Sequence, residues 1–135
     1  MRNVTTLHIS AGMRSALLSI RDRMDRAGIM LSGLCAVHCL LSIVVVSFLG
    51  LGGGLLLAPS IHRVGLALAV AIGLVTLGIG LSRHGRPGPL LVGLAGLTLM
   101  SAGLVVAHGL SEALLTIPGV MLVALAHIGN LRHTA

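Results

Sequence analysis

Four long stretches without a charged side chain divide this 135-residue chain and limit what it can fold into. They cover residues 27–61, 64–82, 87–111 and 113–131. Each has at least 19 residues, close to the roughly 20 that a helix rising about 1.5 Å per residue needs to cross a hydrocarbon layer of about 30 Å. A soluble amphipathic helix would carry a charged face instead. The stretches therefore predict four transmembrane helices.

The composition favours helices over a transmembrane β-barrel. Hydrophobic residues make up 56% of the chain and charged residues 9%, and the chain has one Phe, no Trp and no Tyr. A barrel would need alternating polarity and girdles of aromatic side chains. The predicted fold class is therefore all-α, an integral membrane four-helix bundle with a short N-terminal amphipathic segment. The expected helices cover residues 28–50, 64–82, 88–108 and 113–131.

The first 26 residues differ from the rest of the chain. Here Arg14 and Arg21 accompany apolar side chains that recur at helical spacing, namely Met13, Leu17, Ile20 and Met24. This pattern is typical of a helix at a membrane surface. We therefore divide the chain into a basic cytoplasmic or interfacial segment, residues 1–26, and a four-helix membrane domain, residues 27–135.

Basic residues border the apolar stretches unevenly. The formal net charge is +6, and every arginine except Arg63 precedes the first stretch, lies at 83–86 or follows the last stretch. By the positive-inside rule, both termini and the 83–86 connection are expected to face the cytoplasm. The basic residues are not interleaved with aromatic ones, so the expected partner is the lipid bilayer and not nucleic acid.

Metal-binding side chains occur inside the first predicted transmembrane helix. Cys35, His38 and Cys39 are three and four residues apart, so they project from one helical face. Sulfur and nitrogen ligands prefer soft or borderline ions such as Hg(II), Cu(I), Zn(II) or Cd(II), whereas Mg(II) and Ca(II) prefer oxygen. An ionisable residue within a membrane span is a functional candidate by default. The spacing therefore predicts a metal site.

A fourth ligand is expected from depth in the membrane. Counting about 1.5 Å per residue from the cytoplasmic boundary places Cys35 about 10 Å, Cys39 about 16 Å and His127 roughly 6 Å inside. His127 is therefore the predicted fourth ligand of a Cys2His2 set, with a snorkelling or backbone-bonded histidine as the alternative. His62 and His108 are expected near the outer surface, solvated at the interface.

Other interpretations stay open beside the metal site. Each cysteine would also pack as a small hydrophobe, and a disulfide within one helix is a minor alternative. His38 and His127 would instead serve as axial ligands in a haem or redox protein, or the chain would be a structural subunit of a membrane complex. Four short helices enclose little space, so a homo-oligomer is kept as an option. An enzyme is not expected, because the three acidic residues lie near membrane surfaces.

Beyond these residues, the chain resembles the MerC family of small inner-membrane proteins associated with mercury resistance and mercuric ion uptake. The resemblance rests on residues 25–28, 31–40 and 126–132, which read DRAG, LSGLCAVHCL and AHIGNLR. It implies four membrane helices, a thiol pair in the first helix that accepts the metal, and delivery toward the cytoplasm. The expected function is binding or transport of a soft or borderline metal ion, Hg(II) or Zn(II).

Overall fold

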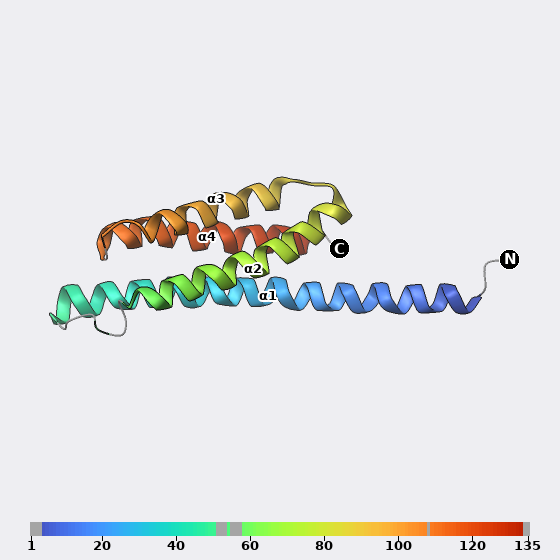
Figure 1. Cartoon of the computed structure of the whole chain (residues 1–135), viewed down its shortest axis with the longest axis horizontal. Coiled ribbons are helices and arrows are strands. Elements are labelled where there is room, and N and C mark those ends of the chain that lie inside the picture. Colours follow the sequence, from blue (N-terminus) through green and yellow to red (C-terminus); the bar gives the residue numbers. More distant parts are fainter. Residues whose placement is uncertain (1–3, 51–53, 55–57, 108, 134–135) are drawn as a thin grey trace.

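The computed structural model describes residues 4–50, 54, 58–107 and 109–133. Its four helices are α1 (Val4–Leu49), α2 (Pro59–His84), α3 (Gly88–Gly103) and α4 (Leu110–Arg132), and the described residues include no strand. Figure 1 shows α2 and α4 beside the second half of α1, and α3 against α4 on the side away from α1. The predicted all-α helical bundle is therefore confirmed.

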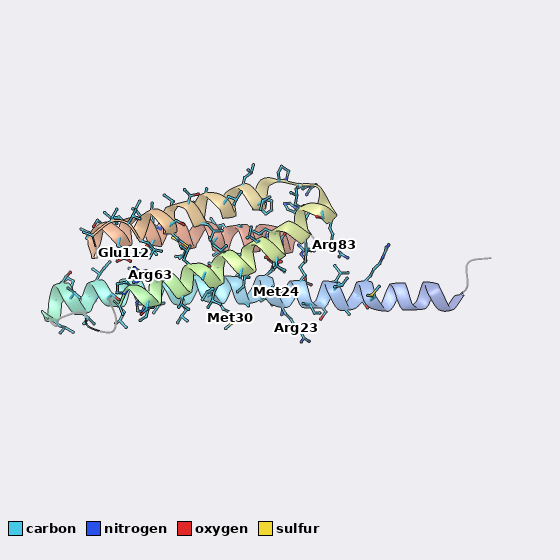
Figure 2. All side chains as sticks on the ribbon, in the orientation of Figure 1. Arg23, Met24, Met30, Arg63, Arg83 and Glu112 are labelled. Carbon is cyan, nitrogen blue, oxygen red and sulfur yellow. The ribbon has the colours of Figure 1, made fainter. Side chains whose placement is uncertain are left out.

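Two ends of the bundle are useful for describing the site (Figure 1). We call the end at which α1 ends and α2 and α4 begin the distal end, and the end at which α2 and α4 end the proximal end. Figure 2 shows Arg63 and Glu112 toward the distal end and Arg83 at the proximal end. Charged side chains therefore mark both ends of the bundle.

Three of the helices are long and apolar enough to cross a membrane. The candidate spans are Gly12–Leu49, Pro59–His84 and Leu110–Arg132, whereas α3 is a shorter apolar helix of 16 residues. Large apolar side chains cover the outside of the bundle, among them Leu34, Phe48, Leu74, Leu91 and Leu125. An exposed apolar surface of this kind suits contact with lipid. The length, composition and surface of the helices are those of a membrane protein.

The first helix is a single continuous element. It has 46 residues, about twice the number needed for one crossing, and its backbone has no break at residue 26, where the sequence suggested a boundary. In Figure 1 its N-terminal part projects past the proximal end of the bundle. Met13, Leu17 and Ile20, in the N-terminal half of α1, are exposed. The basic segment, from residue 4 onward, and the first membrane helix therefore form one continuous helix.

Besides the start of α1, three helix boundaries differ from the predicted ones by three residues or more. α2 begins at Pro59 instead of residue 64, and α4 begins at Leu110 instead of residue 113. A charged residue ends a hydropathy stretch, but it does not end a helix, and proline is well suited to a first helical turn. α3 ends at Gly103 instead of residue 108, because the amides of the next two residues bond to carbonyls three residues back. His62 and Glu112 thereby become part of helices.

Glycines allow α3 and α4 to approach closely. A Cβ on Gly96 would lie 2.6 Å from the Gly119 carbonyl oxygen, and a Cβ on Gly119 would lie 2.8 Å from the Gly96 oxygen. Small residues at such crossings let helix backbones touch in a membrane. Beside this contact lies the buried core of Ala69, Met100, Val120 and Val123, against which Leu31, Cys35 and Ala36 of α1 pack. The cysteine-bearing part of α1 therefore packs against a core that α2, α3 and α4 form together.

Replacing Gly96 by alanine is expected to destabilise the bundle, because the added methyl group would push the α4 backbone away. Over-packing of this kind costs about 1–3 kcal/mol, which thermal unfolding in detergent would detect. Gly78→Ala is the matched control, since a Cβ there meets nothing within 4 Å. Equal stability of the two variants would contradict the close α3–α4 contact.

Candidate functional site

Both cysteines of α1 face α2. Cys39 is buried, Cys35 is half-buried, and both are free thiols. The Cys39 Sγ atom lies 3.9 Å from His62 Nε2, and a Cβ on Gly65 would lie 3.6 Å from the Cys35 Sγ atom. Positions four residues apart on α1 thus meet positions three residues apart on α2, as expected for facing helices. The two thiols share one contact between α1 and α2.

His62 is the imidazole at the centre of this contact. Its Nε2 atom faces Cys39, and its Nδ1 atom lies 3.5 Å from the Oε1 atom of Glu112 on α4. The His38 and His62 rings meet edge to face, with centroids 5.4 Å apart. The His62 side chain is only 11% exposed and that of Glu112 only 5%. The His62 ring therefore lies between a thiol of α1 and a carboxylate of α4.

A cavity of about 500 Å³ opens beside these side chains. Its lining includes Cys35, His38, Cys39 and His62 together with apolar side chains such as Leu31, Leu34 and Met100. A smaller hollow of about 50 Å³ lies on the distal side and is lined by Ser42, Ser47 and Glu112. Cys39 and His62 line both spaces. The thiol–imidazole contact therefore lies between a small hollow on the distal side and a larger cavity.

The contact is not yet a complete coordination shell. Among the described residues, no three His, Cys, Asp or Glu side chains already converge as metal ligands. Ser42 does not add one, because its hydroxyl donates to the His38 carbonyl at 2.8 Å. An ion at this position would therefore draw the side chains of Cys35 and His38 inward by rotation about their side-chain bonds.

The structure does not bring His127 to the thiols. Its Nδ1 atom lies 2.7 Å from Asp25 Oδ1, and its Nε2 atom faces Gly28, where a Cβ would collide with the ring. Gly28 is seven residues before Cys35, about 10 Å along the helix. The depth count missed this offset because it gave α1 and α4 the same boundary, whereas buried Asp25 holds His127 nearer the proximal end. His38 and His127 accordingly do not form the facing pair that a haem would need.

Two residues near the cysteines were not predicted as part of the site, namely His62 and Glu112. Both lie in the first turns of α2 and α4, which were predicted to begin after these residues. A proline three residues before His62 was the available signal, since proline favours a first helical turn. His108, expected near the outer surface, lies outside the described residues.

Comparison with known protein families identifies the family of this chain. The model of the family described as MerC mercury resistance protein matches residues 25–132. Comparisons with curated proteins and with solved structures gave no match. The matched range begins at the aspartate that contacts His127, and it contains α2, α3, α4 and the part of α1 from residue 25 onward. Since this range is most of the chain, the protein belongs to the MerC mercury resistance protein family and is a membrane protein.

Proposed function

We propose that the protein binds a soft or borderline metal cation, Hg(II) or Zn(II), inside the membrane and passes it across. Cys35, His38 and Cys39 are the ligands expected from the sequence, and we add His62. The observation that carries the proposal is the contact between the Cys39 thiol and the His62 imidazole in a cavity shared with the other two side chains. Membership in a mercury resistance family supports the same class of cargo.

The donor atoms determine which ions fit. Two thiolates and two imidazoles favour soft or borderline cations, and they disfavour Mg(II) and Ca(II), which prefer oxygen. Glu112 lies on the side of His62 away from Cys39, at ion-pair distance from Nδ1. A carboxylate in this position holds the proton on Nδ1 and turns the Nε2 lone pair toward the metal, as around most metal-binding histidines. Glu112 is therefore a positioning residue for His62.

Exchange of ligands would move the ion along α1. The ion would first meet Cys39 and His62, which the distal hollow reaches directly. Cys35 lies one helical turn away, about 6 Å along the axis, on the wall of the larger cavity. Transfer from one thiolate to the next needs no more than the release of one ligand at a time. This route runs from the distal toward the proximal end, which is inward if the termini face the cytoplasm.

The chain's own residues give no sign of an energy-coupling or hydrolytic step. The sequence lacks a nucleotide-binding motif, and the only acidic residue beside the site is Glu112. We therefore propose a carrier or binding protein of the inner membrane and not an enzyme. Its cargo would move down its own gradient or with another ion.

Metal affinity in detergent-purified, reduced protein tests the ligand set. We expect Cys35→Ser/Cys39→Ser to lose zinc or cadmium binding, and His62→Ala to weaken it, because each removes a donor atom. Glu112→Gln is expected to weaken binding by roughly 10–100-fold as the change of an outer-shell partner. His133→Ala, on the exposed end of α4, is the control and should bind as wild type. If both His62→Ala and Glu112→Gln bind the metal with wild-type affinity, His62 is not a ligand.

Binding is also expected to release protons, because a thiol ligates as its thiolate. For each thiol proton displaced, the affinity should fall by roughly tenfold per pH unit as the pH is lowered below the range in which free thiols ionise. Titration calorimetry in buffers of different ionisation enthalpy measures the protons released. An affinity independent of pH between about 6 and 8 would contradict thiolate ligation.

Transport is tested by cadmium uptake into vesicles that contain the purified protein and an indicator dye. We expect wild-type protein to move the ion, Cys39→Ser to abolish movement, and Gly33→Ala, which adds a methyl group in open space on the same helix, to leave it unchanged. Binding without any movement in wild type would reduce the proposal to a membrane metal-binding protein.

A further inference from the structure

A second polar cluster lies inside the bundle, toward the proximal end and apart from the cysteines. It joins α1, α2 and α4, and each member is at most 1% exposed: Arg21, Asp25, Thr76, His127 and Asn130. No metal-binding sulfur lies within it. Polar and charged groups withdrawn from water in this way are costly unless they are paired, and ionisable ones within a membrane are commonly functional.

Asp25 receives most of the bonds in this cluster. The His127 Nδ1–H group donates to Asp25 Oδ1 at 2.7 Å, and the Asn130 side-chain amide donates to Oδ2 at 2.9 Å. Arg21 is held less closely, with Nε 3.7 Å from Oδ2, while its Nη2 donates to the Asn130 carbonyl at 2.9 Å. With Asp25 ionised and Arg21 charged, the cluster is neutral overall when the His127 ring is neutral.

His127 retains one unused position. Its Nε2 atom is buried and has no hydrogen-bond partner, and it faces the backbone of α1 at Gly28, where there is room for the ring only because no Cβ is present. Because Nδ1 already carries the hydrogen shared with Asp25, Nε2 holds the free lone pair. Two nitrogens of Arg21, Nε and Nη1, also lack a hydrogen-bond partner, but a guanidinium has no free lone pair. His127 Nε2 is therefore the unpartnered nitrogen of this cluster that is able to accept a proton.

We propose that the Asp25–His127 pair is a proton-binding site, at which His127 Nε2 takes up one proton from the aqueous phase at the proximal end. The new N–H bond uses the Nε2 lone pair, and the added positive charge is stabilised by the Asp25 carboxylate at Nδ1. The inference goes beyond metal binding, because none of its residues contacts the cysteine site.

Proton uptake would change how α1 is held against α4. Two cations, His127 and Arg21, would then share one carboxylate, and Arg21 has the longer contact. Release of Arg21 would break its bond to the Asn130 carbonyl, which links α1 to α4. The other groups facing the pair are uncharged Thr76 of α2, 3.4 Å from His127 Nδ1, and His84 of α2, 3.1 Å from Asn130 Oδ1. α3 has no titratable residue.

Nitrogen NMR of the metal-free, full-length protein in lipid nanodiscs, with ¹⁵N-labelled histidine, tests the proposal. We expect His127 to be the Nδ1–H tautomer at about pH 8 and to become doubly protonated as the pH falls toward about 5. The resonance that disappears in His127→Gln is assigned to His127. If His127→Gln does not fold, single variants of the other histidines assign their own resonances, and the one left over belongs to His127. A ring that stays neutral throughout this range would overturn the proposal.

Two variants separate proton binding from simple packing. Asp25→Asn should shift protonation of His127 to lower pH or abolish it, because the stabilising charge is gone. Gly28→Ala should move the ring from Asp25 and remove the preference for the Nδ1–H tautomer, whereas Gly33→Ala, with open space at its Cβ, should titrate as wild type. Titration of His127 that is identical in wild type, Asp25→Asn and Gly28→Ala would also overturn the proposal. No metal is present, so the result is independent of the proposed transport.

Discussion

In the hydrocarbon of a membrane no water is available to a polar side chain, so each one must find its partner inside the bundle or at an end. This constraint organises the protein. Between residues 28 and 42 the polar side chains of α1 are buried or half-buried, namely Ser32, Cys35, His38, Cys39 and Ser42. Apolar side chains of α1 such as Leu34 and Phe48 are exposed on the outside. Two polar clusters result, one around Cys39 and His62 and the other around Asp25 and His127.

The proximal cluster gives a physical reason for two of the segments in which the chain resembles its family. Residues 25–28 and 126–132 are about a hundred positions apart in the sequence, yet they meet through Asp25, Gly28, His127 and Asn130. Each member depends on the others: the carboxylate orients the ring and the amide, and the glycine makes room for the ring. Their meeting sets the axial position of α1 against α4. It thereby also sets which residues of α2 and α4 lie level with the cysteines.

The sequence predicted well what depends on local pattern. The uncharged stretches indicated the helices because hydropathy and helix length are properties of one segment, and the spacing of Cys35, His38 and Cys39 placed them together on α1 because helix geometry is fixed. Helix starts were less predictable, since Arg63 and Glu112 end an uncharged stretch without ending a helix. The partners across helices were unpredictable for a further reason. The position of α1 along its axis relative to α4 is set by tertiary contacts such as Asp25–His127. Counting residues from the membrane boundary does not take such contacts into account.

The most direct test of the metal-site account is X-ray absorption at the zinc edge of the loaded, reduced protein. The account predicts a mixed shell of sulfur and imidazole nitrogen, with a nitrogen contribution that decreases in His62→Ala and a sulfur contribution that is absent in Cys35→Ser/Cys39→Ser. A shell that is identical in wild type and His62→Ala, or one with oxygen and nitrogen but no sulfur in the wild type, would contradict it.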